Sequence, residues 1–473
     1  MNRWLLLTSF FLVLLAPLAI SWAIGHRVQH THGDLELVIM TPHQEAIRRE
    51  FAEAFDRWHR AKFGQSVNID YRSFGTSDIV KYFSERAKSR SSDTDTFGVD
   101  LVWGGGDVFA DIQMKRPGYL QPLKLDEAVM KAVYPNPRLA GLPLYDLDPK
   151  SGPCWYGATF SSFGIVYNRD VLRYLGVAEP KTWKDLADPR LAGWLAMADP
   201  TRSGSAKQVY MAIVERAMAD AAEQGRSEDD GWADGMGLVR QISANARLFT
   251  DSSSVVPIMV STGDAAAGMA IDFYGRSQAD SVAAGRMNYV EPENATIINP
   301  DPIAMAKGAM HPELAKRFVE FVLSAEGQRL WNTRPGVPGG PRLTPLRRLP
   351  IDPAAYADMS THTDPVNPFV ATTSFNKSAA REKTWGIMGD LIQYSCIDLL
   401  DELRDTRAAI RKSAKRDELD ASLGRFPFGQ MEALRRQAML RDPKTTVVRQ
   451  LELQREWTGE FRAEYARLRE RAK

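Results

Sequence analysis

Short apolar runs alternate with amphipathic helical repeats over the first hundred residues that follow the N-terminal segment. Residues 34–40, 67–71 and 99–103 are short stretches with apolar positions, and each is a predicted strand. Between the first two runs, residues 45–58 place Ile47, Phe51, Phe55 and Trp58 on one helical face, and a second helix is expected from Ser77 or Asp78 to Lys88. This strand–helix–strand–helix order predicts a parallel sheet with helices on both faces.

A second region of the same kind follows. Residues 163–167, 194–198 and 266–271 are predicted strands, and a helix is expected over 206–219. Residues 221–234 are polar and acidic and are predicted to form a surface excursion. Residues 252–261 are predicted to begin as a loop and become a helix.

Residues 301–331 predict a strand, a glycine turn at Gly308 and a pair of helices. Pro312 suits the first position of a helix because its missing N–H costs nothing there. The stretch 334–368 is rich in proline and glycine and indicates loop. Beyond it, apolar positions from Trp385 to Leu403 predict one long amphipathic helix, and 445–473 is highly charged helical sequence.

The N-terminus suggests export. Arg3 precedes an uncharged run from Trp4 to Ile24 that is long enough to span a bilayer. The run also fits an export signal, with small residues Ser21 and Ala23 at a cleavage site. Residues 1–33 are therefore expected to be a signal peptide or a membrane anchor with a spacer. Either one places the rest in the periplasm or at the cell surface, tethered to the membrane if the segment stays uncleaved.

Composition excludes several classes. A formal net charge of +1 gives no reason to expect a nucleic-acid partner. Cys154 and Cys396 do not make a disulfide framework; they either pair or are two separate buried thiols. No zinc-protease, Walker A or nucleophile-elbow signature occurs, so the chain is not expected to be an enzyme.

Several predicted strands end in residues suited to a ligand. The run Thr201–Ser205 ends a strand and opens a helix, where free N–H groups and hydroxyls can hold an anion, although plain helix capping explains the serines too. Tyr274 and Arg276 follow another strand, and a phenol and a guanidinium can bind a metal or an anion. The candidate ligand residues are Thr41, His43, Gly105, Gly106, Ser161, Ser162, Thr201, Ser203, Gly204, Ser205, Ser253, Tyr274 and Arg276.

Residues 35–349 resemble the periplasmic ferric-iron and related-anion solute-binding proteins of bacterial ABC uptake transporters. The segment 301–331 resembles the stretch where that family recrosses between lobes. His43 matches an iron-binding histidine. Tyr274 keeps the second of two adjacent iron-binding tyrosines, whereas Phe273 replaces the first.

Other positions depart from the family or match its anion site. Gly105 and Gly106 occupy a region where some iron binders supply a glutamate, and Ser161 and Ser162 lie where many carry an arginine. The run Thr201–Ser205 matches the helix start that binds phosphate or carbonate. Ferric iron prefers several hard oxygen ligands, which His43 and Tyr274 alone do not supply.

The resemblance implies an α/β fold built as a two-lobed clamp of the type II periplasmic-binding-protein kind. Lobe 1 would comprise residues 34–160 and the return over 304–349, lobe 2 residues 161–303, and a mostly helical extension residues 350–473. It implies a ligand that is ferric iron or a small anion such as a phosphonate or carboxylate, no resident cofactor, and a membrane permease as partner. A membrane-tethered sensor or scaffold with the same clamp is the alternative.

Overall fold

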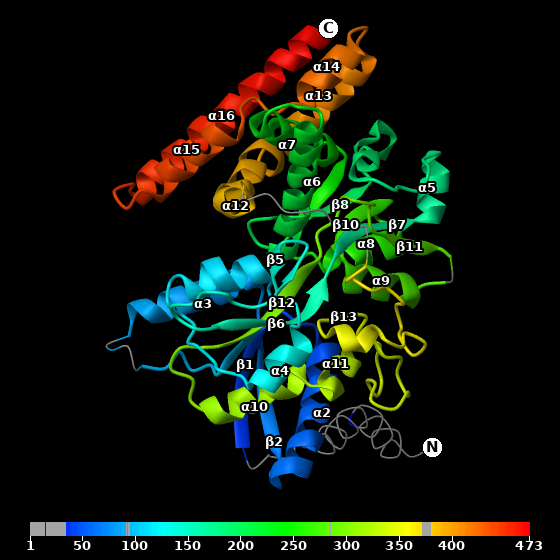
Figure 1. Cartoon of the computed structure of the whole chain (residues 1–473). Coiled ribbons are helices and arrows are strands. Elements are labelled where there is room, and N and C mark those ends of the chain that lie inside the picture. The colour runs from blue at the N-terminus through cyan, green and yellow to red at the C-terminus, as the bar shows by residue number, and fades with distance from the viewer. Residues whose placement is uncertain (1–14, 16–34, 91, 93–94, 284, 371–379) are drawn as a thin grey trace, which may run out of the picture.

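The computed structural model describes Leu15 and residues 35–90, 92, 95–283, 285–370 and 380–473. Its two larger sheets lie one above the other in Figure 1, and helices cover both. The predicted export segment, residues 1–33, lies outside the described residues apart from Leu15. Within the described residues, no helix has both the length and the apolar character needed to cross a membrane.

The first sheet has the strand order β13-β6-β12-β3-β1-β2. Strand β1 pairs in parallel with β2 and β3, as the alternating sequence pattern predicts. The returning strand β12 runs antiparallel to both β3 and β6. The strands are β1 (Leu35–Thr41), β2 (Val67–Ser73), β3 (Leu101–Trp103), β6 (Trp155–Ser161), β12 (Asn299–Met305) and β13 (Leu349–Pro350).

An aromatic core joins this sheet to its helices. The ring of Phe51 lies 5.0 Å from that of Trp103 and 4.4 Å from that of Trp331, and all three side chains are buried. The helices of this lobe are α2 (Glu45–Phe63), α3 (Thr76–Lys88), a π-helix (Phe109–Lys115), α4 (Glu127–Val133), α10 (Pro312–Leu323) and α11 (Ala325–Asn332), and a small hairpin pairs β4 (Arg138–Leu139) with β5 (Leu142–Pro143).

The second sheet has the order β11-β7-β10-β8-β9. Its strands are β7 (Phe163–Asn168), β8 (Leu195–Ala198), β9 (Ala246–Thr250), β10 (Ala267–Ile271) and β11 (Met287–Val290). Its helices are α5 (Arg169–Leu175), α6 (Gly204–Glu223), α7 (Glu228–Ser243), α8 (Val255–Thr262) and α9 (Asp272–Ser281), with 3-10 turns at Trp183–Ala187 and Pro189–Leu191.

The chain crosses between the sheets at two described places. Ser161 ends β6 in the first sheet and Phe163 begins β7 in the second, so Ser162 is the crossing residue. The return runs from the end of β11 at Val290 to the start of β12 at Asn299. A two-lobed α/β fold is thus confirmed.

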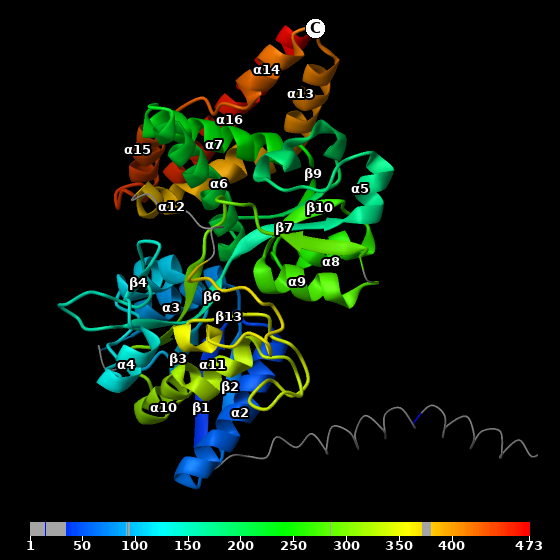
Figure 2. The same ribbon diagram turned by 45° about the vertical axis from the view of Figure 1, so that its right-hand side comes forward.

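The C-terminal region forms a helical layer over the second lobe (Figures 1 and 2). It contains α12 (Ala380–Ile392), a π-helical turn (Gln393–Ile397), α13 (Leu400–Lys412), α14 (Arg416–Leu423), α15 (Gln430–Arg441) and α16 (Val447–Ala472), whereas the 3-10 turn at Pro353–Tyr356 lies by the first sheet, where the Tyr356 hydroxyl donates to the Pro350 carbonyl. The predicted helical extension is confirmed, but the single long helix expected over 385–403 is wrong, because the π-helical turn and the bend at Leu399 divide it.

One other local prediction was wrong. Residues 221–234 are not a surface excursion, because α7 begins at Glu228 and buries Trp232 completely against its neighbours. Asp272–Arg276 follow strand β10, as predicted, and form the first turns of α9. Cys154 and Cys396 are free, buried thiols.

Candidate ligand-binding site

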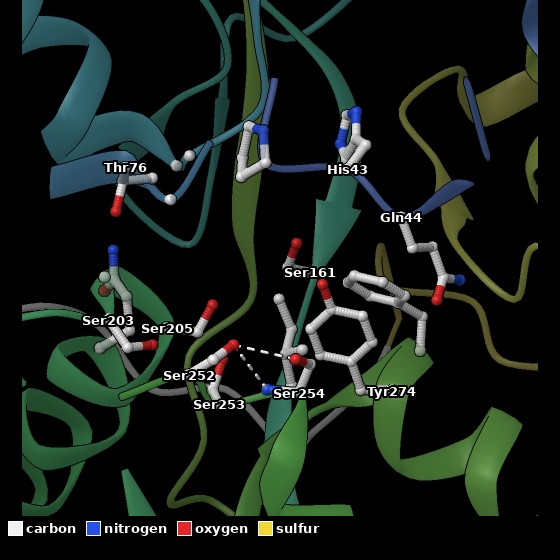
Figure 3. Close-up of a pocket in the computed structure, with 18 of the residues that line it drawn as sticks. His43, Gln44, Thr76, Ser161, Ser203, Ser205, Ser252, Ser253, Ser254 and Tyr274 are labelled. Carbon is white, nitrogen blue, oxygen red and sulfur yellow. Dashed lines mark hydrogen bonds between the residues drawn. The ribbon is translucent and has the colours of Figure 1, made fainter. Parts of the chain in front are cut away.

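A cavity of about 820 Å³ lies between the two sheets. Residues from both lobes line it, and they lie just beyond the carboxyl ends of β1, β3, β8, β9 and β10. Open α/β sheets bind ligands at this edge because the turns there present backbone and short polar side chains. Figure 3 shows the cavity with hydroxyl groups along one side and His43, Gln44 and Tyr274 on the other.

The start of α6 forms one end of the cavity. Ser203 caps the helix, since its Oγ accepts a hydrogen bond from the Ala206 N–H at 3.2 Å. The turn before it is held by Asp199, whose Oδ1 accepts from the N–H and the hydroxyl of Thr201, both at 2.7 Å. Ser205 lines the cavity one residue into the helix. This end therefore presents first-turn N–H groups and hydroxyls to the cavity.

A second helix start, from the other lobe, meets the first. Thr76 begins α3, and its Oγ1 lies only 2.8 Å from where a Cβ on Gly204 would be. The hydroxyl of Ser77 donates to the carbonyl oxygens of Thr201 and Arg202, at 3.3 Å each. The positive ends of two helices, α3 and α6, thus converge on one end of the cavity from opposite lobes.

The opposite end contains a buried polar cluster. His43 Nε2 lies 3.1 Å from Asp301 Oδ2, and Arg348 Nη2 donates to the same oxygen at 2.6 Å. Arg348 also donates to Ser161 Oγ at 2.7 Å and lies over the ring of Phe273, 4.5 Å from its centroid. The side chain of Arg348 is fully buried. Asp301, His43 Nε2 and Arg348 Nη2 are thus paired with one another, whereas His43 Nδ1 and Arg348 Nε and Nη1 have no hydrogen-bond partner among the described residues.

Protonation in this cluster follows from burial and pairing. Burial alone would raise the pKa of Asp301, but Arg348 and His43 hold that pKa well below its usual range. Burial lowers the pKa of His43 in spite of the hydrogen bond to Asp301. Because the Asp301 carboxylate can only accept, His43 Nε2 carries the proton of a neutral imidazole at neutral pH.

The glycine run after β3 supports this end. Gly104, Gly105 and Gly106 have φ values of 104°, 104° and 85°, a region that favours glycine. A Cβ on Gly105 would lie 2.5 Å from the ring of Phe109. The Gly106 N–H donates to Asp301 Oδ1 at 3.0 Å. The glycines thus let the backbone adopt positive φ values and bind Asp301. This role explains them without a phosphate-binding loop.

The cavity gathers most of the predicted ligand residues. His43, Gly105, Gly106, Ser161, Thr201, Ser203, Gly204, Ser205, Ser253 and Tyr274 all line it. Burial raises the pKa of Tyr274, so its hydroxyl is neutral, and in Figure 3 it points across the cavity towards Ser161.

The structure does not bring three of the predicted residues to the cavity lining. Arg276 is paired with Glu291, its Nη2 donating to Oε1 at 2.5 Å. Thr41 lies beneath the turn, where its hydroxyl donates to the Trp103 carbonyl at 2.6 Å. Ser162, at the crossing, donates to Glu291 Oε1 at 2.6 Å.

Sequence reasoning missed the residues that depend on distant contacts. Arg348 lies in the proline-rich stretch predicted as loop. Asp301 begins the segment 301–331, where a strand was predicted but no ligand residue. Hydroxyls after Gly75 could have been found from the same helix-start signal as Thr201–Ser205. The missed lining residues include Arg48, Thr76, Ser77, Lys81, Gln208, Asn299, Asp301 and Arg348.

The described residues offer no cluster of side chains for a metal centre. Among them, no three His, Cys, Asp or Glu side chains are grouped so that they could hold a metal ion. His43 has its Nε2 committed to Asp301, and Tyr274 is a neutral phenol. Four cationic side chains line the cavity, Arg48, Lys81, Arg202 and Arg348, together with three carboxylates, Asp78, Asp251 and Asp301. Arg202 is paired with Asp251, and Arg348 with Asp301.

Comparisons with known proteins agree with this fold. Residues 113–348 match the model of the bacterial extracellular solute-binding protein family. An uncharacterised protein of Haemophilus influenzae is 26% identical over 233 residues, which are 48% of this chain and 60% of that protein. The phosphoglycerate transport regulatory protein PgtC of Salmonella typhimurium is 25% identical over 170 residues, 36% of this chain and 38% of that protein. The chain thus spans less than two thirds of the length of either curated relative.

A solved structure covers more of the chain. The periplasmic binding protein AfuA of Actinobacillus pleuropneumoniae, with fructose-6-phosphate bound, superposes with a TM-score of 0.55 at 18% identity. The match covers 79% of this chain and 97% of AfuA. At this identity the likeness concerns the fold.

Proposed function

Because the chain carries a bacterial extracellular solute-binding domain, we propose that it is the extracytoplasmic substrate-binding component of an ABC uptake transporter. We further propose that it captures an organic anion with a phosphate, phosphonate or carboxylate group. The family consists of proteins that bind a solute without transforming it, as expected for a chain that is not an enzyme. A membrane permease is the proposed partner, and the N-terminal segment, if uncleaved, is the proposed membrane contact.

The convergence of two helix starts supports the proposal that the ligand is an anion. The first turns of α3 and α6 come from different lobes and meet at Thr76 and Gly204. An anion held there receives hydrogen bonds from both lobes at once, so it favours the state in which the lobes are together. Arg202, Lys81 and Ser205 line the same cavity and add positive charge and hydroxyl groups.

The size of the cavity supports an organic molecule rather than one ion. At about 820 Å³ it falls in the range of small-molecule sites, far larger than a single ferric ion needs. Between its two ends Ser252, Ser253 and Ser254 line the cavity. Ferric iron stays the alternative ligand, and it would require Tyr274 to ionise and His43 to leave Asp301.

Binding of stated probes tests this proposal. The probes are inorganic phosphate, 3-phosphoglycerate, fructose-6-phosphate and ferric citrate, each added to the chain from about Gly33 in calorimetric titrations. At least one phosphate-bearing probe should bind and make the chain more compact in X-ray scattering. Binding of ferric citrate alone would overturn the anion proposal.

A pair of matched capping variants locates the anion. Ser203 caps α6 and Ser227 caps α7, with Oγ accepting from the Asp230 N–H at 3.1 Å. Ser203→Ala and Ser227→Ala should each cost about 1 kcal/mol of stability, because each removes a cap. Ser203→Ala, and likewise Ser205→Ala, should weaken binding of the phosphate probe, whereas Ser227→Ala should not. Equal affinities in both variants would reduce Ser203 to a cap.

A sensor or scaffold is a second candidate, favoured by one observation. The helices α12 to α16 lie over the second lobe and provide a surface that the family model does not cover. Genes for a permease and an ATPase beside this gene would support transport, whereas a neighbouring sensor kinase gene would support the sensor.

A further inference from the structure

The C-terminal helical layer lies directly behind the turn that opens the cavity. Gly389 of α12 is buried, and a Cβ on it would be 3.4 Å from the Pro200 carbonyl oxygen and 3.3 Å from Lys207 Cε. Pro200 immediately precedes the cavity residue Thr201. Lys207 lies in the first turns of α6, where its N–H donates to the Ser203 carbonyl at 3.1 Å. Figures 1 and 2 both show α12 beside α6.

Lys207 connects the two layers through an aromatic ring. Its Nζ lies 5.3 Å from the ring centroid of Trp385, a buried residue of α12. A cation over an indole ring is attracted by its negative face, more strongly when water is excluded. Burial lowers the pKa of Lys207 although the nearby Asp390 acts to raise it, and burial raises the pKa of Asp390. The cation is thus held inside the contact between α6 and α12.

The layer is anchored independently on α7. Arg240 is fully buried, and its Nη1 donates to both carboxylate oxygens of Glu464 at 3.0 and 2.9 Å. Its Nη2 also donates to the carbonyl oxygens of Leu423 and Arg425, at 2.7 and 2.8 Å. These bonds fix the helical layer to the back of the second lobe. A shift of α12 would therefore also displace α6, against which it packs.

We infer that the helical layer sets the position of the turn Pro200–Ser205, with Lys207 and Trp385 as positioning residues. Docking of the layer and binding of the anion are then coupled. By reciprocity, an anion in the cavity tightens the docking of α12. A binding protein that reports occupancy through these helices requires such coupling. The part of this inference that concerns affinity rests on the proposed anion site; the part that concerns the turn does not.

Hydrogen exchange on the whole, ligand-free chain tests the turn. Lys207→Met keeps the length of the side chain and removes the cation, whereas Lys207→Arg keeps a cation for the Trp385 ring. Trp457→Leu is the matched control, because Trp457 holds Arg436 at 5.1 Å in the same helical layer, on α16. Exchange at residues 201–206 should rise about fivefold or more in Lys207→Met and in Trp385→Leu, while Lys207→Arg and Trp457→Leu stay close to wild type.

Titration of the same variants with 3-phosphoglycerate and inorganic phosphate tests the coupling. Affinity for a probe that binds wild type should fall about tenfold in Lys207→Met and recover in Lys207→Arg. Unchanged exchange, or faster exchange with unchanged affinity, would overturn the inference. If neither probe binds wild type, the proposed anion function fails and the exchange result alone decides on the turn. Should Trp385→Leu fail to fold, Lys207→Met decides.

Discussion

The two ends of the cavity are built on opposite principles. At one end His43, Asp301 and Arg348 bind one another in a buried cluster, with Arg348 Nη2 at 2.6 Å from Asp301. At the other end, the starts of α3 and α6 present N–H groups and hydroxyls that face the cavity. The first end binds the Asp301 carboxylate with its own His43 and Arg348, although His43 Nδ1 and Arg348 Nε and Nη1 have no partner among the described residues. The second end lines the cavity with the hydroxyls of Thr76 and Ser205 and with the first turns of two helices, so we propose that it takes the ligand.

This difference bears on how the lobes come together. The self-paired end lies beside the crossing at Ser162, where the lobes are covalently joined. The open end lies where the lobes meet only through contacts such as those of Thr76 and Ser77. A ligand at the open end adds interactions where the two lobes would otherwise separate, so its binding energy can drive closure.

The largest effect should come from breaking the self-paired end. Arg348→Met leaves the buried carboxylate of Asp301 without its cation, which should cost about 3–5 kcal/mol in the free energy of unfolding. The control is Arg202→Met at the open end, where the ion pair with Asp251 is exposed and should cost less than about 1 kcal/mol. Urea denaturation followed by circular dichroism measures both. Similar losses in the two variants would mean that the ends do not differ in kind.

A pH profile sharpens the account of the self-paired end. Burial raises the pKa of Asp272 to about 6, although Arg276 and Arg348 act to lower it. The folded chain therefore holds this proton more tightly than the unfolded chain, and the resulting stability is lost as the pH rises through 6. Over about two pKa units the loss is on the order of 3 kcal/mol.

The Asp272→Asn variant should remove this dependence. Between pH 4 and pH 7 its stability should rise relative to wild type by that amount, in denaturant titrations at each pH. Asp301→Asn gives the opposite sign, because the pKa of Asp301 is lowered and its contribution is lost only in acid. Parallel profiles for wild type and Asp272→Asn would place the titrating carboxyl elsewhere.

The sequence predicted the open end better than the self-paired one. A strand followed by Thr201–Ser205 and a helix is a local pattern, and hydroxyls near a helix start can be read within a few residues. Asp301 is 258 positions from His43, and Arg348 comes from a stretch that the sequence marks as loop. Periodicity does not encode such contacts, because they form only when β12 returns to the first sheet.

The same limit explains why Arg276 was expected to bind the ligand and why residues 221–234 were expected to be exposed. Arg276 was favoured as a ligand residue because it follows a strand, but the turn continues as α9 and the guanidinium meets Glu291. Polar sequence around 221–234 suggested exposure, yet α7 is amphipathic and covers α6 with Trp232 inside. The overall α/β order was predictable, since it rests on strands and helices that are strongly apolar on one side, whereas the clamp was expected from the resemblance to solute-binding proteins.

A smaller effect should follow from adding one methyl group at the open end. In Gly204→Ala the new Cβ would lie 2.8 Å from Thr76 Oγ1, so it opposes the approach of the lobes. Affinity for a phosphate probe should fall about tenfold, a cost of about 1.4 kcal/mol. The stability of the second lobe should stay the same or rise, because alanine favours the helix.

Thr76→Ala in the same chain provides the control. It removes the clashing oxygen and should restore compaction by the probe in X-ray scattering, even where affinity stays reduced. Closure that Gly204→Ala leaves unimpaired would show that the lobes do not meet at Thr76 in the bound state.

The smallest effect is expected at Tyr274, which lies between the two ends. Its hydroxyl is neutral because burial raises its pKa, and it points across the cavity. Tyr274→Phe should remove one hydrogen bond to an organic anion, which is worth about 0.5–1.5 kcal/mol, so affinity for the phosphate probe should fall roughly twofold to tenfold. Unfolding should be unchanged within about 0.5 kcal/mol. The visible spectrum with ferric citrate is the deciding readout, and wild type should show no tyrosinate band. A band that disappears in Tyr274→Phe would mean that Tyr274 binds iron as phenolate. In that case His43 would have to leave Asp301, and the self-paired end, rather than the helix starts, would be the part of the cavity that takes the ligand.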